Sequence, residues 1–159
     1  MNKALEKVLN ITSLLMETGL EWTLGPLVLL QIVTGDVTSK VDLAIHIDDF
    51  SDNIVALLER IGIEKVFYVV NRGFSNRCIY AWGLPCISIE DMIVSFWHDK
   101  NKPYRSIVLE ILQRTPPNTV DWGYIRNTAL RLKILDNIEQ ALTEASLDKS
   151  CLKELLRRG

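Results

Sequence analysis

The clearest pattern in the sequence is a strict alternation of apolar and polar positions just after residue 40. Apolar side chains occupy every second position from Val41 to Ile47, with Asp42, Ala44 and His46 between them. Successive side chains of a strand point to opposite faces of its sheet, so this period of two predicts a strand over residues 41–47. We expect Asp42 and His46 to share one face, and we expect that face to be solvated.

Three further segments have the composition of strands. Residues 21–24 form a short candidate strand before a Gly-Pro pair, residues 65–70 contain an uninterrupted apolar run, and residues 77–82 follow a loop over residues 71–77. Short apolar runs bounded by turn-forming residues are typical of buried strands. The sequence therefore predicts four strands near residues 21–24, 41–47, 65–70 and 77–82 in one mixed sheet.

Helical spacing of apolar residues covers much of the rest of the chain. It predicts helices over residues 3–18, 26–33 and 51–61, then over 89–97, 105–113, a segment after Asp121, 135–145 and 152–158. Ser51, Ser88 and Asp121 are candidate N-caps, and Pro26 suits the first helical position because the missing N–H of proline has no intrahelical partner there. Residues 88–158 are thus expected to be almost wholly helical.

These elements predict an α/β fold of the α+β kind, with a small mixed sheet flanked by helices and a helical C-terminal half. The length of 159 residues suits one domain. We expect residues 1–87 to form the α/β core and residues 88–159 to form a helical subdomain.

Composition narrows the functional classes. The formal net charge of −2 argues against a general nucleic-acid binder, although a local basic patch stays compatible with it. No apolar stretch approaches the roughly 18 residues of a membrane helix, and the N-terminus does not resemble a signal peptide. Three cysteines without metal-type spacing indicate reduced thiols, so we expect a cytoplasmic protein with no membrane association.

Three segments carry a resemblance to a known family through their order and spacing. A short strand ends at Gly25-Pro26 ahead of a helix, Asp42 follows on the alternating strand, and residues 83–91 place Gly, Pro, Ser and an acidic pair before another helix. Together they resemble the nucleotidyltransferase superfamily, in particular the small toxin-type members of abortive-infection systems. The resemblance implies a nucleotidyltransferase-like fold over about residues 20–145.

The resemblance also implies roles for particular residues. A glycine turn at a helix N-terminus offers N–H groups to phosphate, and strand carboxylates hold Mg²⁺. On that basis Gly25 and Lys40 are candidate nucleotide-binding residues, and Asp42 is the relic of the catalytic carboxylates. Lys40 stands where the family has its first metal-binding Asp, Pro26 replaces the second residue of the glycine pair, and residues 66–70 and 102–106 lack the other acids.

These departures favour a pseudoenzyme that binds a nucleotide, RNA or a protein partner, with no metal and no cofactor. One alternative is a divergent Mg-dependent nucleotidyltransferase, toxin-like, that uses Asp42 and a flanking aspartate. The other is a structural or regulatory homodimer formed by the helical half.

Other residue groups have both a functional and a structural interpretation. His46 is either an acid–base group or a structural histidine. Asp36, Asp48 and Asp49 are either solvated turn residues or part of an improvised metal site with Asp42. Trp82, Trp97 and Trp122 are either stacking surfaces or core residues. The loop over residues 71–77 either contacts phosphate or RNA or is an ordinary hairpin loop. The basic residues near the C-terminus either contact a nucleic acid or a partner or simply favour the end of a helix: Lys149, Lys153, Arg157 and Arg158.

Overall fold

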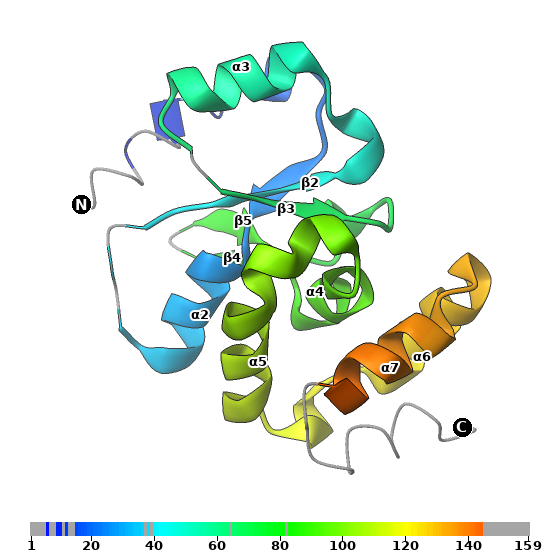
Figure 1. The fold of residues 1–159 in the computed structure, drawn as a ribbon. Coiled ribbons are helices and arrows are strands. Elements are labelled where there is room, and N and C mark those ends of the chain that lie inside the picture. Colours follow the sequence, from blue (N-terminus) through cyan, green and yellow to red (C-terminus); the bar gives the residue numbers. More distant parts are fainter. Residues whose placement is uncertain are drawn as a thin grey trace.

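In the computed structural model of the protein, a five-stranded mixed sheet lies at the centre (Figure 1). The structure describes residues 15–36, 38, 40–63, 65–81 and 83–144, together with residues 6, 9, 10 and 12. The strand order is β3-β2-β1-β5-β4. The strands are β1 (Trp22–Leu24), β2 (Leu43–His46), β3 (Val66–Val69), β4 (Ile79–Ala81) and β5 (Leu84–Cys86).

The pairing of the strands makes the sheet mixed. β1 is antiparallel to β2 and parallel to β5, β2 is parallel to β3, and β4 is antiparallel to β5. All four predicted strands are confirmed. β5 was not predicted, because it is only three residues long and has Pro85 at its centre. Pro85 has no N–H to donate, and the register joins β5 to β1 only through Leu24 and Cys86.

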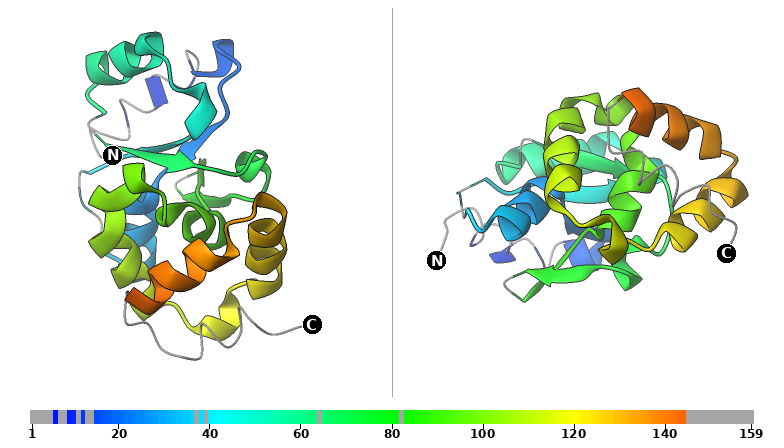
Figure 2. Two further views of the ribbon diagram at one scale, coloured as in Figure 1. Left: turned by 45° about the vertical axis from the view of Figure 1, so that its right-hand side comes forward. Right: turned by 90° about the horizontal axis from the view of Figure 1, so that it is seen from below.

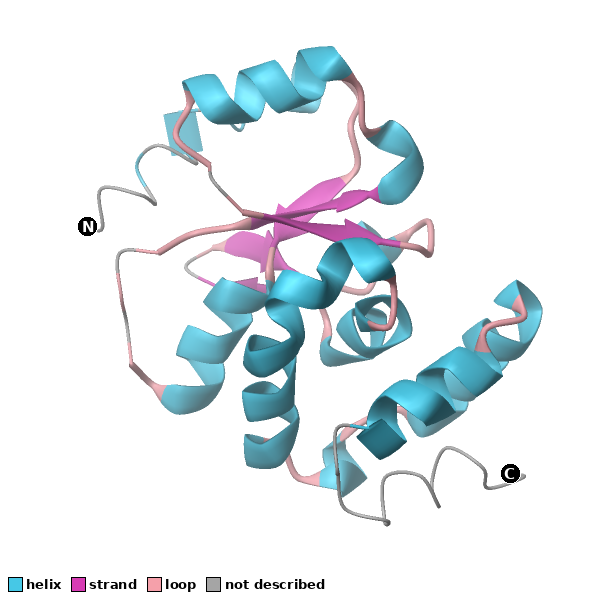
Figure 3. Ribbon diagram, in the orientation of Figure 1, coloured by secondary structure: helices cyan, strands magenta, loops and turns pink. Residues whose placement is uncertain are grey.

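Helices cover both faces of the sheet (Figures 1 and 3). α3 lies over one face, whereas α2, α4 and α5 lie over the other, and Figure 2 shows α6 and α7 as a further layer beyond α4. The helices are α2 (Pro26–Thr34), α3 (Asp52–Arg60), α4 (Ile89–Phe96), α5 (Arg105–Arg114), α6 (Trp122–Leu132) and α7 (Leu135–Glu144). Short 3₁₀ helices are η1 (Ile47–Asp49), η2 (Phe74–Asn76), η3 (Asp99–Tyr104) and η4 (Pro117–Thr119).

The predicted fold class, an α+β fold with a helical C-terminal half, is confirmed. In the described part of the chain, α2, α3, α4, α5 and α7 begin and end within two residues of their predicted bounds, and α6 follows Asp121 as expected. The helix expected over residues 152–158 lies outside the described residues, as does half of the one expected over residues 3–18.

The N-caps show why these helices begin where they do. Ser51 accepts a hydrogen bond from the N–H of Ile54 at 3.2 Å, and the side chains of Ser88 and Asp121 do the same for residues three positions on. α2 is different: its N-cap is Gly25, which has no side chain, and Pro26 follows at the first position. The other N–H groups at the start of α2 therefore need an acceptor from elsewhere in the chain.

The expectation of a solvated face on the alternating strand is wrong. Asp42 is fully buried and His46 is 4% exposed. The alternation correctly identified a strand, but both faces of β2 are covered because helices lie on both sides of the sheet. Polar residues on the inner face of a two-sided sheet must find partners within the protein.

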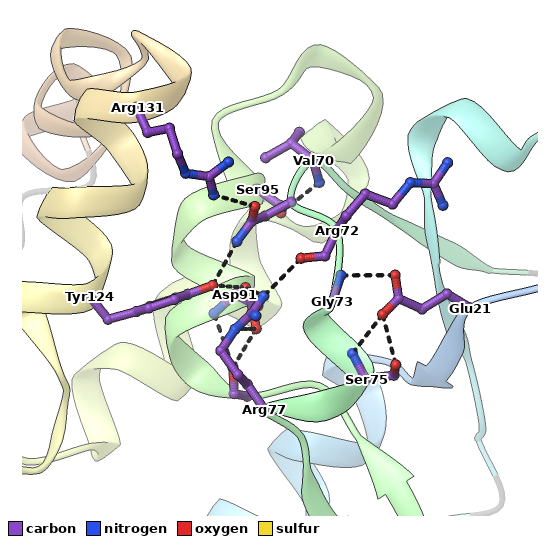
Figure 4. Close-up of polar contacts among 12 residues, drawn as sticks. Glu21, Val70, Arg72, Gly73, Ser75, Arg77, Asp91, Ser95, Tyr124 and Arg131 are labelled. Carbon is purple, nitrogen blue, oxygen red and sulfur yellow. Dashed lines mark hydrogen bonds and ion pairs between the residues drawn. The ribbon is translucent and has the colours of Figure 1, made fainter.

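A buried carboxylate in α4 joins the loop after β3 to the helical half (Figure 4). Asp91 is fully buried and accepts hydrogen bonds from Arg77 Nη2 at 3.1 Å and Arg77 Nε at 3.2 Å. It also accepts bonds from the hydroxyls of Tyr124 at 2.8 Å and Ser88 at 3.1 Å. The Arg77 guanidinium lies 4.9 Å from the centre of the Tyr124 ring. Burial raises the pKa of Tyr124 to about 12, and the charge of Asp91 adds to this effect.

The same network continues on both sides of Asp91. Asn71 donates to the Tyr124 hydroxyl at 2.7 Å and accepts from Arg131 at 2.7 Å, which joins the end of β3 to α6. Glu21, just before β1, accepts from the N–H groups of Gly73 at 3.0 Å and Ser75 at 3.1 Å (Figure 4). The loop over residues 71–77 is therefore fixed by internal partners at both ends.

This network predicts a large stability loss for Asp91→Ala. The change removes the acceptor that Arg77 and Tyr124 share. Because Asp91 is fully buried but Arg77 is 34% exposed, we expect a loss of about 2 kcal/mol or more. Asp99→Ala is the matched control, because Asp99 pairs with Lys102 on the surface and should cost at most about 0.5 kcal/mol. Urea unfolding measures both free energies; a loss below about 1 kcal/mol for Asp91→Ala would show that the network contributes little.

Candidate functional site

The carboxylate of Asp42 lies at the N-terminus of α2. Its Oδ2 accepts a hydrogen bond from the N–H of Leu27 at 3.1 Å and another from the hydroxyl of Tyr104 at 2.7 Å. The backbone carbonyl of Asp42 accepts from the N–H of Gly25 at 3.0 Å. Asp42 therefore supplies the acceptor that Gly25 cannot, and its negative charge lies at the positive end of the helix dipole.

Gly25 is required by this arrangement. A Cβ at this position would lie 2.5 Å from Asp42 Oδ2 and 2.6 Å from its Cγ, well inside van der Waals contact. The backbone of Gly25 is extended, with φ −97° and ψ −169°, which any residue before a proline can adopt. The constraint is therefore the close packing of the Asp42 carboxyl group, not the backbone conformation.

Tyr104 is the second partner of Asp42 and comes from the far end of η3. Its side chain is buried, and its ring packs edge-on against Phe67 with ring centres 5.1 Å apart. Burial raises the pKa of the Tyr104 hydroxyl, and the neighbouring charge of Asp42 raises it further, so this hydroxyl is a stable hydrogen-bond donor. No local pattern in the sequence predicts this contact, because it joins residues 62 positions apart.

Burial also changes the acidity of Asp42. It raises the pKa of this carboxyl group to about 6, against the opposing effect of the hydrogen bonds from Tyr104 and Leu27. The second oxygen, Oδ1, is buried without a hydrogen-bond partner among the described residues. A single enclosed carboxylate of this kind stabilises the start of a helix, but it offers no open face to a substrate.

The structure brings together only part of the predicted site. Gly25 and Asp42 are in contact, whereas Lys40 is exposed. Within the described part of the chain, no hydrogen bond or ion pair links the side chain of Lys40 to Asp42. The Lys40 carbonyl accepts a hydrogen bond from Gln31 Nε2 at 2.7 Å, which joins the segment before β2 to α2.

The flanking acidic and histidine residues have separate partners. Nδ1 of His46 accepts from the N–H of Asp48 at 3.1 Å, so this histidine caps η1. Asp49 binds Arg72 through two hydrogen bonds of 2.6 and 2.7 Å, and the Arg72 guanidinium in turn lowers the pKa of Asp49. Asp36 is exposed. Across residues 15–36, 38, 40–63, 65–81 and 83–144, no group of three His, Cys, Asp or Glu side chains is placed to hold a metal ion.

The other candidates are mostly structural in the described chain. Trp97 and Trp122 donate from their indoles to the backbone carbonyls of Val94 at 2.6 Å and Pro117 at 2.9 Å. Arg72 and Arg77, the two arginines of the loop, are paired with Asp49 and Asp91. Trp82 and the basic residues at 149, 153, 157 and 158 lie outside the described residues.

Comparisons of the chain with protein-family models, with curated proteins and with solved structures gave no match. Within the described residues, no helix combines the length and the apolar character needed to cross a bilayer.

We predict that Gly25→Ala destabilises the protein through Asp42. Overpacking of this kind costs about 1–3 kcal/mol. Gly123→Ala is the matched control, since its nearest atom would be Asp121 Oδ1 at 3.4 Å and alanine favours the helix. In an Asp42→Ala background the penalty of Gly25→Ala should fall by about 1 kcal/mol or more, as measured by a double-mutant cycle in urea. Equal penalties in both backgrounds would contradict the proposed clash.

We also predict a pH dependence that belongs to Asp42. Because its folded pKa of about 6 lies above the ordinary 3.8, protonation favours the folded state. The stabilisation is complete below pH 3.8 and is lost as the pH rises through 6. The difference between the folded and the ordinary pKa of Asp42 corresponds to about 3 kcal/mol of folding free energy. The stability difference between the wild type and Asp42→Asn, which does not titrate, should therefore fall by about this amount between roughly pH 4 and 7. A difference that is constant with pH would contradict the assignment.

Proposed function

We propose that this protein is a nucleotidyltransferase-like domain that binds a nucleotide without transferring it. The observation that carries the proposal is the enclosure of Asp42, the one carboxylate left from the pattern that the family uses to bind metal. Its Oδ2 is shared between the Leu27 N–H and the Tyr104 hydroxyl, and the side chain is fully buried.

Support for the family assignment comes from the proximity of the segments that carry the resemblance. Gly25 and Asp42, from two of these segments, are in contact, and Cys86 of the third, residues 83–91, pairs with Leu24 across β1 and β5. The proposal places this cluster where an active relative would have its metal and phosphate site.

Metal-dependent transfer requires what this cluster lacks. Mg²⁺ prefers six oxygen ligands at about 2.1 Å in octahedral geometry, usually with carboxylates open to water and substrate. Here the carboxylate is enclosed, and the start of α2, which would otherwise attract a phosphate, already has an internal anion. A nucleotide bound by this protein must therefore find its positive charge elsewhere, from lysine or arginine side chains.

One observation favours the alternative of a divergent Mg-dependent transferase. Asp42 Oδ1 is buried and has no partner among the described residues, which leaves one oxygen of the carboxylate with unused acceptor capacity.

The cytoplasm is the location that we propose in either case, because the buried thiol of Cys86 and the half-buried thiol of Cys78 are unpaired, as is usual in a reducing compartment.

Magnesium separates the two functions. We predict that ~10 mM Mg²⁺ changes the melting temperature of the wild type by less than about 1 °C, because a ligand stabilises a protein only if it binds the folded state. Incubation with labelled nucleoside triphosphates and Mg²⁺ should give no transfer above that of Asp42→Asn. Stabilisation by several degrees in the wild type that Asp42→Asn abolishes, or transfer that depends on Asp42, would instead establish the enzyme.

A further inference from the structure

A cavity of about 340 Å³ opens beside the edge strand β3, between α3 and η3. Residues Phe50, Glu59, Lys65, Tyr68, Lys100 and Tyr104 contribute to its lining. Its volume is at the lower end of the range for small-molecule sites, which suits a mononucleotide better than a longer chain. It does not include Gly25, Lys40 or Asp42, and it adjoins the cluster at the start of α2 through Tyr104.

Aromatic rings form part of the cavity wall. Phe50 and Tyr68 pack against each other with ring centres 4.3 Å apart and planes tilted by 31°. Both side chains are half-buried, so their rings are partly accessible from the cavity. Partly exposed aromatic rings of this kind provide a stacking surface for a planar base, whichever base it is.

Two lysines on the rim supply positive charge. Lys65 Nζ lies 5.6 Å from the centre of the Tyr104 ring, and Lys100 Nζ lies 5.2 Å from the centre of the Tyr68 ring. Among the described residues neither ammonium has an ion-pair partner, whereas Arg72, Arg77 and Lys102 each have one. Unpaired cations over aromatic rings are suited to an anion such as a phosphate group.

Hydrogen bonds between one side chain and the backbone of β3 hold the cavity wall in place. Asn101 accepts from the N–H of Tyr68 at 2.9 Å and donates to its carbonyl at 2.8 Å, which fixes η3 along the edge of β3. Because Asn101 lies next to Lys100 and close to Tyr104 in the chain, this contact positions both residues. A site whose walls are fixed in this way binds its ligand at a lower entropic cost.

We propose that this cavity binds a nucleoside monophosphate, with the base against Phe50 and Tyr68 and the phosphate between Lys65 and Lys100. This inference rests on the proposed function and names the site of that nucleotide. Glu59, also in the lining, is a hydrogen-bond acceptor for a base that carries an amino group, such as adenine. Because the lysines supply the positive charge, binding requires no metal.

The test is calorimetric titration of the full chain with AMP in EDTA. We expect binding with a Kd below about 1 mM, and weaker binding of adenosine and of inorganic phosphate, each of which lacks half of the contacts. Lys65→Gln and Lys100→Gln should each weaken AMP binding about tenfold. Phe50→Leu should weaken the binding of AMP but not that of phosphate.

One lysine variant serves as a control, and a second tests the competing site. Lys102→Gln removes an exposed charge from η3 outside the cavity, and Lys40→Gln tests the other candidate nucleotide site. Neither should change the affinity for AMP. AMP binding that Lys40→Gln abolishes and Lys65→Gln leaves unchanged would overturn the proposed cavity while leaving the proposed function intact. The absence of binding by any nucleoside mono-, di- or triphosphate, in EDTA or in Mg²⁺, would overturn both.

Discussion

The structure depends on one internal interaction, the burial of the Asp42 carboxylate against the first turn of α2. A buried carboxylate is costly unless donors surround it, and here the donors are the Leu27 N–H and the Tyr104 hydroxyl. That requirement fixes three other features. Gly25 must lack a side chain, the start of β2 must lie beside α2, and η3 must bring Tyr104 to the same point.

This interaction also occupies the groups at the start of α2 that could otherwise bind a ligand. In an open site, a strand carboxylate and a glycine turn would face a metal ion and a phosphate; here they face each other. In the cavity that we propose for a nucleotide, Lys65 and Lys100 supply the positive charge, on the other side of Tyr104. Tyr104 thus connects the two regions, since its hydroxyl binds Asp42 and its ring lines the cavity.

The sequence predicted what depends on local physics and missed what depends on tertiary contact. Helix bounds and the N-caps at Ser51, Ser88 and Asp121 follow from periodicity and side-chain chemistry within a few residues. β5 was missed because a three-residue strand around Pro85 has no periodic signal. The pairing of Asp42 with Gly25 was consistent with the resemblance, but the burial of Asp42 and its bond to Tyr104 depend on the packing of η3 against the start of β2, which no local pattern reveals.

The most direct test of this account is the ¹³C NMR signal of the Asp42 carboxyl carbon, measured as Mn²⁺ is added. Mn²⁺ binds sites of the Mg²⁺ type and broadens the signals of nuclei close to it. We predict a carboxyl signal that titrates near pH 6 and that substoichiometric Mn²⁺ does not broaden. Selective broadening of the Asp42 signal, with other buried carboxylates such as Asp91 unaffected, would show that a metal reaches this carboxylate and would contradict the account.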